Sequence, residues 1–231
     1  MERWKVAEGQ GQPWYVNPSC TLSSVDRVSA EEGMALLQTY HDGPVLLDDT
    51  CCTMAQELPA GAVVVTYCSG CDRRFRQRED IRAITFWEAV DQMPQIPLPH
   101  YPQLQVSIHD SCAYRDQPQV HDAVRSLLKK MAITVVESPN SREKSVCCGG
   151  SRYPDLPLDE VRKMQQRRAA QMPCQDVVVT CPSCMKSMAI GGKTPHHLLH
   201  LILGKTTDPG ELDWETYVAV KSAMKQQRRK G

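Results

Sequence analysis

The sequence predicts an α/β protein built from two tandem, related halves with parallel sheets, followed by a C-terminal helix. Strand-like runs alternate with segments whose apolar residues have helical spacing, and this alternation favours parallel sheets. The cysteines recur in one order in both halves, and their flanking residues recur with them, which indicates an internal duplication. We predict a first repeat over residues 1–98 and a second repeat over residues 99–231 that includes the C-terminal helix.

The first half is expected to begin with a strand at WYV, shortly before its first cysteine. A helix, two strands and a closing helix then follow in the predicted order, at 29–41, 44–49, 62–66 and 80–93. The helix expected between Cys52 and Ala62 is missing or one turn long. The segment 94–103 is predicted to be a stiff, proline-rich linker to the second half.

The second half is expected to repeat this alternation with longer connections. Its predicted strands are rich in β-branched residues and lie at 104–108, 133–138 and 176–180. Its predicted helices lie at 120–132, 158–172 and 195–204, the last opened by proline and closed by glycine. The C-terminal helix is expected at 211–228.

The eleven cysteines divide into two sets of five, with one left over. Each set has the same order: a lone cysteine, then an adjacent pair, then a CxxC motif. The first cysteine set consists of Cys20, Cys51, Cys52, Cys68 and Cys71. The second cysteine set consists of Cys112, Cys147, Cys148, Cys181 and Cys184. Cys174 fits neither set and is expected to be an ordinary residue at a helix end.

The cysteines are expected where strands end and loops begin, which is where open α/β sheets bind their ligands. Clustered thiolates repel one another, and a multi-iron centre offsets that charge with thiolate as its usual ligand. Cys147 and Cys148 can reach one centre only if the backbone turns between them, and Gly149 with Gly150 supplies that freedom. A structural zinc needs four ligands, one fewer than each set offers.

The overall composition argues against several classes of partner. Lysine plus arginine number 27 and aspartate plus glutamate number 27, so we expect no nucleic-acid partner. The sequence shows no signal-peptide core and no apolar run long enough to span a membrane, so we expect a cytoplasmic protein. In a reducing compartment, many cysteines indicate metal or redox chemistry rather than disulfides.

The two five-cysteine motifs resemble the cysteine-rich CCG domain family, whose best-known member is an iron–sulfur component of heterodisulfide reductase. The resemblance implies an iron–sulfur subunit of a cytoplasmic, anaerobic oxidoreductase, in which each cysteine set ligates one noncubane [4Fe–4S] cluster. Electrons would come from a ferredoxin-like iron–sulfur subunit or a flavin subunit and pass to a disulfide, quinone or similar acceptor. The first motif departs from the family pattern, because it has CCT instead of CCG and only 15 residues separate Cys52 from Cys68. One cluster, two clusters, or zinc in the first site are therefore the alternatives.

Two other functions stay open at this point. A strand followed by CPSC and a helix also describes a thioredoxin-like dithiol oxidoreductase, with Cys181 as the nucleophile. That function leaves both adjacent cysteine pairs unexplained. The other alternative is a zinc-binding scaffold without a redox role.

Histidines and arginines near the cysteines have two interpretations each. The reacting centre is expected near Cys147, Cys148 and His109, and His109 either donates a hydrogen bond to a cluster sulfur or is satisfied by backbone. His196 and His200 are predicted to lie one turn apart on a helix, a spacing that can bind metal, and we favour instead a helix face that contacts the core and a partner. The arginines after the first CxxC either balance a negative cluster or form a solvated face, and we favour the solvated face for Arg73, Arg74, Arg76 and Arg78.

Overall fold

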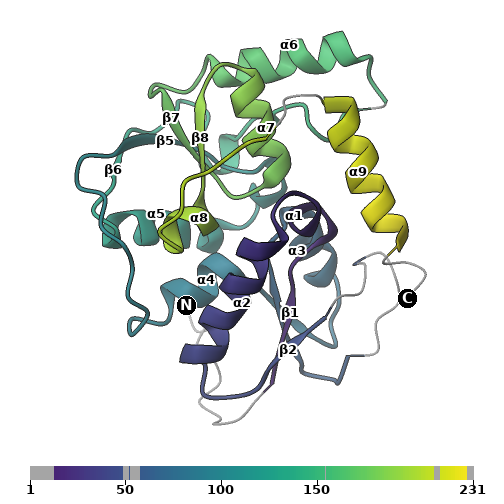
Figure 1. Cartoon of the computed structure of the whole chain (residues 1–231), viewed down its shortest axis with the longest axis vertical. Coiled ribbons are helices and arrows are strands. Elements are labelled where there is room, and N and C mark those ends of the chain that lie inside the picture. Colours follow the sequence, from purple (N-terminus) through teal and green to yellow (C-terminus); the bar gives the residue numbers. More distant parts are fainter. Residues whose placement is uncertain (1–12, 49–51, 53–57, 154, 211–213, 228–231) are drawn as a thin grey trace.

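The computed structural model describes residues 13–48, 52, 58–153, 155–210 and 214–227. These residues form an α/β fold with two four-stranded sheets, and all the strand pairings in them are parallel. Helices surround both sheets, and α9 (Trp214–Gln227) runs along one side of the molecule from the second half towards the first (Figure 1). The predicted fold class, including the C-terminal helix, is therefore confirmed.

The first sheet lies within the predicted first half and has the strand order β2-β1-β3-β4. Its strands are β1 (Trp14–Asn17), β2 (Val45–Leu47), β3 (Val63–Thr66) and β4 (Arg82–Thr85). Its helices are α1 (Cys20–Val25), α2 (Arg27–Tyr40), α3 (Ser69–Phe75) and α4 (Phe86–Asp91). The short or missing helix expected after Cys52 falls largely on 53–57, outside the described residues.

The second sheet has the order β6-β5-β7-β8, so each strand occupies the place of its counterpart in the first sheet. Its strands are β5 (Gln105–His109), β6 (Thr134–Val135), β7 (Asp176–Val179) and β8 (Thr194–His197). Its α-helices are α5 (Pro118–Lys130), α6 (Leu158–Ala169), α7 (Pro182–Ile190) and α8 (Leu198–Ile202). Two 3₁₀ turns precede α5 and α6: η1 (Cys112–Tyr114) and η2 (Arg142–Lys144). Within the described ranges, no helix has the length and apolar character needed to cross a membrane.

The predictions of closing helices at 80–93 and 195–204 were wrong about where each helix begins. In each case a four-residue strand, β4 or β8, comes first and a short helix follows directly. At the first boundary Thr85 accepts a hydrogen bond from the Glu88 amide while the Glu88 carboxylate accepts one from the Thr85 amide, so a capping box starts the helix late. At the second boundary Pro195 lies in β8, where an edge strand tolerates proline.

An apolar core joins the two halves. One cluster of buried side chains includes Trp14, Val65 and Trp87 from the first half together with Leu127 and Leu198 from the second. Helix α4 packs against α5, and α2 packs against α8. Burial of this much apolar surface fixes the relative position of the halves. The boundary between residues 98 and 99 stays a prediction.

Arg76 does not lie on a solvated face, which corrects one part of the prediction for the arginine group. Its side chain donates 2.7 Å hydrogen bonds to Asp72 and to Glu88, and both carboxylates are buried. Burial raises the pKa of Asp72 to about 6, although the Arg76 charge acts in the opposite direction. The rest of the group behaves differently: Arg73 and Arg74 are exposed, and Arg78 pairs with the exposed Asp80.

Replacing Arg76 by methionine should destabilise the fold strongly, since two buried carboxylates would lose their partner. We expect a loss of about 3–5 kcal/mol in the free energy of unfolding, as measured by chemical denaturation. Arg78→Met is the matched control, because it removes the same side chain from an exposed ion pair and should change stability little. Equal losses for the two variants would contradict this interpretation of the Arg76 network.

Candidate metal centre

The second cysteine set gathers at the carboxyl ends of two adjacent strands. β5 and β7 pair in register, with His109 opposite Val179 at their ends. Cys112 begins η1 directly after β5, and Cys181 is the N-cap of α7 directly after β7. Because parallel strands end at the same edge of a sheet, these two cysteines are brought together by the strand pairing itself.

The adjacent pair and the last cysteine complete the group. The Sγ atoms of Cys148 and Cys184 are 3.5 Å apart. The Cys147 thiol lies in hydrogen-bonding contact with those of Cys112 and Cys148, and the Cys184 thiol with that of Cys181. The five side chains that the sequence groups by their order in the chain therefore form one continuous thiol cluster.

The thiols of this cluster control one another's protonation. Hydrogen bonds from Cys112 and Cys148 hold the pKa of Cys147 far below its ordinary value, and the Gly149 amide donates to its sulfur at 3.3 Å. The same contacts raise the pKa of Cys112 and raise the pKa of Cys148 to about 11, in each case because Cys147 lies next to them. Contact with Cys148 and with Cys181 also raises the pKa of Cys184. Negative charge on one thiol thus disfavours charge on its neighbours, and all five can ionise together only when positive charge is bound among them.

The turn after the adjacent pair requires glycine at two positions. Gly149 has a φ of +90°, and a Cβ there would lie 2.9 Å from the Cβ of Met164 on α6. A Cβ on Gly150 would lie 3.0 Å from the indole ring of Trp214 on α9. The backbone freedom of glycine is therefore used at Gly149, whereas Gly150 allows the close approach of α9.

Three residues of the first cysteine set are brought together by the structure. The Cys71 thiol contacts those of Cys52 and Cys68, and both contacts raise the pKa of Cys71. Cys20 begins α1 at the end of β1, the strand that neighbours β3, so it lies at the sheet edge where Cys68 also lies. Cys51 falls outside the described residues.

The two cysteine sets lie across the interface between the halves. Ser111, which precedes Cys112, donates a 3.0 Å hydrogen bond to Ser69, which follows Cys68. The pKa of Tyr217 on α9 is raised by burial and then by the charges of Cys181 and Cys68, one from each set. Helix α9 packs against α1 and borders this interface (Figure 1).

A comparison with family models matches residues 106–189 to the cysteine-rich domain called CCG. The second half of this chain is therefore similar to the CCG family over these residues, and residues 106–189 are called the CCG domain below. The matched residues include all five members of the second cysteine set together with β5, β7 and α6. The family model does not extend over the first cysteine set.

One curated protein with similarity to the chain is a probable membrane-anchored ferredoxin from Chromohalobacter salexigens. The two sequences are 28% identical over 112 residues, an alignment that covers 43% of this chain. The same alignment covers 16% of the relative, so this chain matches only a small part of that protein's length.

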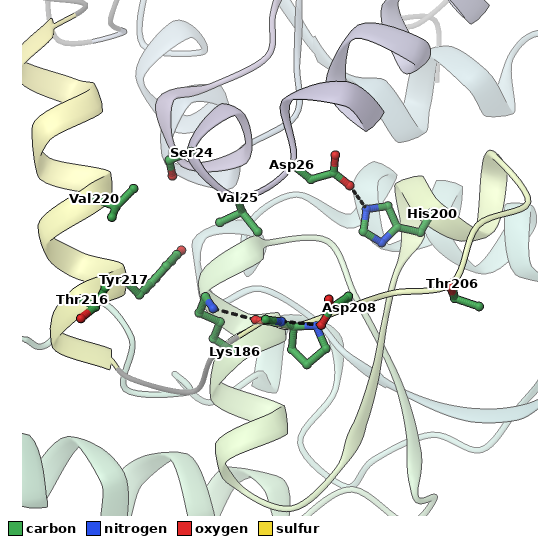
Figure 2. A pocket seen from close by; sticks show the side chains of 12 residues that line it. Ser24, Val25, Asp26, Lys186, His200, Thr206, Asp208, Thr216, Tyr217 and Val220 are labelled. Carbon is green, nitrogen blue, oxygen red and sulfur yellow. Dashed lines mark hydrogen bonds and ion pairs between the residues drawn. The ribbon is translucent and has the colours of Figure 1, made fainter.

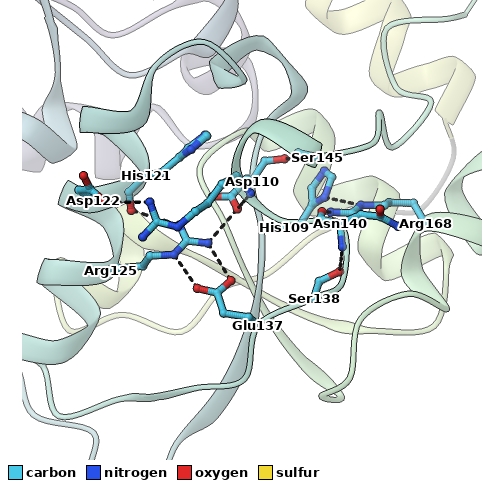
Figure 3. A network of polar contacts seen from close by, with 11 residues as sticks. His109, Asp110, His121, Asp122, Arg125, Glu137, Ser138, Asn140, Ser145 and Arg168 are labelled. Atoms are coloured by element: carbon cyan, nitrogen blue, oxygen red, sulfur yellow. Dashed lines mark hydrogen bonds and ion pairs between the residues drawn. The ribbon is translucent and has the colours of Figure 1, made fainter.

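His109 and Arg168 form a buried pair in the CCG domain (Figure 3). Arg168 donates from Nε to Nδ1 of His109 at 3.0 Å, so a side chain and not the backbone satisfies this nitrogen. Burial lowers the pKa of His109 to about 3, and the neighbouring Arg168 charge adds to this effect. A ring nitrogen of His109 and the Sγ atoms of Cys148 and Cys184 all lie within 4.8 Å of one another.

Sequence reasoning did not single out Arg168, because nothing in the run QQRRAAQ distinguishes it from Arg167. The position of Arg168 on the buried face of the helix was the signal that could have identified it. Val161, Gln165 and Arg168 are spaced for one face of α6, and all three are buried, whereas Arg167 is exposed.

A second network holds the loops that carry the cysteines (Figure 3). The Asp110 carboxylate accepts two hydrogen bonds from Arg125, at 2.9 and 3.1 Å, and a third at 2.7 Å from the backbone amide of Arg142. Burial alone would raise the pKa of Asp110, but these donors hold it below its ordinary value. The Ser145 hydroxyl donates to the Asp110 carbonyl, so the loop before Cys147 is fastened to the strand end before Cys112.

The prediction that His196 and His200 share one helix face is wrong. His196 lies in β8, where its Nε2 is 2.7 Å from a carboxylate oxygen of Asp176 on β7. His200 lies in α8 and its Nε2 is 2.9 Å from Asp26, in the first half. The two histidines belong to different elements because β8 occupies the expected first turn of the helix.

His200 also borders a cavity of about 400 Å³ between α1, α7, α8 and α9 (Figure 2). Opposite Asp26 and His200, the Lys186 ammonium donates to the carbonyl of Pro209 at 2.6 Å. Tyr217 lines the same cavity, and its hydroxyl is 2.8 Å from that of Ser183 inside the CPSC motif. The cavity therefore lies next to the helix that carries Cys184.

Replacing Gly149 by alanine should destabilise the CCG domain more than the same change at Gly192. Both glycines have positive φ, +90° and +85°, where an added Cβ costs about 1–2 kcal/mol. Gly149→Ala carries the additional clash with Met164, whereas nothing lies within 4 Å of a Cβ at Gly192. Chemical denaturation of the two variants measures the difference, and equal losses would show that the packing against α6 does not require this glycine.

Proposed function

We propose that the chain is an iron–sulfur subunit of a multi-subunit redox complex, similar to the CCG-containing component of heterodisulfide reductase. It would carry electrons to a disulfide, quinone or similar acceptor and act as an oxidoreductase subunit. The observation that carries this proposal is the cluster of five thiols in the CCG domain, centred on the 3.5 Å contact between Cys148 and Cys184.

The donor set fits an iron–sulfur centre. Thiolate is the usual ligand of such clusters, and five thiols exceed the four that a tetrahedral zinc site uses. The ligands of the proposed cluster are Cys112, Cys147, Cys148, Cys181 and Cys184. When bound, an iron–sulfur cluster supplies one-electron transfer. The noncubane [4Fe–4S] type is proposed from the resemblance to heterodisulfide reductase.

We propose a second, less complete centre at the first cysteine set. Its ligands would be Cys20, Cys51, Cys52, Cys68 and Cys71. The contacts among Cys52, Cys68 and Cys71 support it. The shorter connection between the pair and the CxxC motif distinguishes it from the second set, and zinc is the fallback there, since four thiolates suffice for zinc.

The proximity of the two sets favours electron transfer within one chain. The Ser69–Ser111 hydrogen bond places the cysteine loops of the two halves against each other. Electrons would enter from a ferredoxin-like iron–sulfur subunit or a flavin subunit, and the similarity to a probable membrane-anchored ferredoxin is consistent with such partners. We also propose that the protein is cytoplasmic and acts in anaerobic metabolism.

The thioredoxin-like alternative is less well supported by the thiol contacts. A dithiol site uses two cysteines, whereas the Cys184 thiol contacts Cys148 as well as Cys181. A redox-inactive zinc scaffold is the second alternative for the CCG domain, since clustered thiols can also bind zinc. Metal content separates these three functions directly.

The test is the amount of iron and acid-labile sulfide per chain in protein purified without oxygen. About eight of each would indicate a four-iron cluster at both sets, and about four would indicate the second set alone. Cys147→Ser and Cys148→Ser should each remove the iron of the second set. Cys174→Ser is the matched control, because Cys174 lies outside both sets and should leave the iron content unchanged.

Two results would overturn the proposal. Zinc without sulfide would favour the scaffold, and a metal-free protein with a reducible Cys181–Cys184 pair would favour the dithiol function. Unchanged iron in both Cys147→Ser and Cys148→Ser would contradict the ligand assignment.

A further inference from the structure

We infer that Arg168 fixes His109 in the tautomer with its proton on Nε2, so that His109 offers a hydrogen-bond donor to a cluster held by the second cysteine set. On this inference His109 is a positioning residue and not a metal ligand. The effect on a cluster rests on the proposed function, whereas the tautomer itself concerns only this chain's own residues.

The first step is the position of the ring. His109 is 1% exposed and lies at the end of β5, the strand that leads into Cys112. Its Nδ1 is occupied by Arg168, and a ring nitrogen lies within 4.8 Å of the Sγ atoms of Cys148 and Cys184. Within the described residues, Nε2 is a buried nitrogen with no hydrogen-bond partner, and the nearby thiols do not supply one. A buried donor left without an acceptor is costly, so a sulfur atom of a bound cluster would supply the acceptor that this nitrogen lacks.

The second step is the direction of the hydrogen bond to Arg168. A guanidinium is always charged and can only donate, so Nδ1 of His109 must accept. A neutral imidazole with an accepting Nδ1 carries its proton on Nε2. The side of the ring away from Arg168 therefore carries an N–H group and not a lone pair.

The direction of this hydrogen bond is opposite to the one that a metal-binding histidine makes with its second ring nitrogen. A histidine that binds metal normally donates its other ring N–H to a carboxylate or carbonyl, which leaves the metal-facing nitrogen unprotonated. His109, Cys148 and Cys184 by themselves have the composition of a zinc site, with one nitrogen and two sulfur donors. The Arg168 contact argues against that assignment for His109, because it occupies Nδ1 and keeps the proton on Nε2, the nitrogen that is left without a partner.

The third step is the way in which Arg168 is held. Its side chain is 1% exposed, and its other hydrogen bonds go to uncharged acceptors: 2.8 Å to Oε1 of Gln171 and 2.9 Å to the carbonyl of Asn140 (Figure 3). A buried cation needs a compensating negative charge. Burial lowers the pKa of Arg168, and the charge of the buried Asp110 carboxylate acts in the opposite direction.

Together, the two residues place one fixed positive charge and one N–H donor beside the same sulfur atoms. Reduction adds negative charge to an iron–sulfur centre, and both groups stabilise that charge. We therefore expect them to raise the reduction potential of a cluster held by the second cysteine set.

The tautomer can be measured directly on the full chain labelled with ¹⁵N-histidine and free of iron. Two-bond proton–nitrogen correlations give the protonation of each ring nitrogen, and His109→Gln assigns the signals. We expect His109 with the proton on Nε2. Arg168→Met should shift the ring towards a mixture of tautomers, whereas Arg167→Met, the exposed neighbour on α6, should leave it unchanged. A proton on Nδ1 in the unchanged protein would overturn the inference.

The iron-loaded protein gives the second readout, a redox titration followed by electron paramagnetic resonance. His109→Phe should keep the iron content and lower the midpoint potential, and His109→Gln, which retains an N–H donor, should restore part of it. Arg168→Met should lower the potential and Arg168→Lys less so, with Arg167→Met as the control. Loss of iron in both His109 variants would make His109 a ligand and overturn the inference, as would equal potentials in all variants. If the unchanged chain holds no iron–sulfur centre, the proposed function fails while the tautomer measurement still decides this inference.

Discussion

The parallel pairing of β5 with β7 is the constraint on which the CCG domain depends. With His109 opposite Val179, the two strands end level with each other, and the chain then leaves both strands towards the same edge of the sheet. Cys112 and Cys181 follow within three residues of the strand ends, so both lie at the same edge of the sheet. A slip in this register would separate them and would also turn His109 away from the thiols, since side chains alternate between the two faces of a strand. The adjacent pair then has only to reach this fixed position, and the glycine turn and the Asp110 network bring it there.

The order of the cysteines was enough to predict that the second set converges, because a lone cysteine and a CxxC motif each follow a strand-like run. The short valine-rich runs in the sequence also predicted the strands of the two sheets. Local patterns failed where a short strand runs directly into a helix, as at β4–α4 and β8–α8. There the helix follows the strand without an intervening turn, and a capping contact or an edge position decides the boundary. Arg168 was missed for a different reason: a buried arginine and an exposed one look alike in sequence, and only the packing of α6 against the domain separates them.

The sheet edges that carry the cysteine loops also lie at the interface between the halves. The apolar contacts of α4 with α5 and of α2 with α8 fix the two sheets relative to each other, and the cysteine-bearing loops then meet at the Ser69–Ser111 contact. Tyr217 and Trp214 of α9 pack beside these loops, the first against Ser183 and the second against Gly150. A helix that follows both repeats in sequence thus shields the place where the repeats come together. This placement explains why the C-terminal helix belongs to the structural unit of the cysteine sets and is not an appended tail.

The duplication nevertheless leaves the two sets in unequal surroundings. Asn17 and His109 occupy the same place, three residues before the lone cysteine and at the end of the corresponding strand. Asn17 donates to the Asp48 carboxylate at 3.0 Å, whereas His109 receives from the Arg168 guanidinium. Arg168 lies on α6, between the adjacent pair and the CxxC motif, where the second half has 32 residues and the first half has 15. The longer connection therefore brings a positive charge to one set, while a carboxylate borders the strand end of the other. The two repeats thus differ in the side chain at the strand end before the lone cysteine and in the charged group that contacts it.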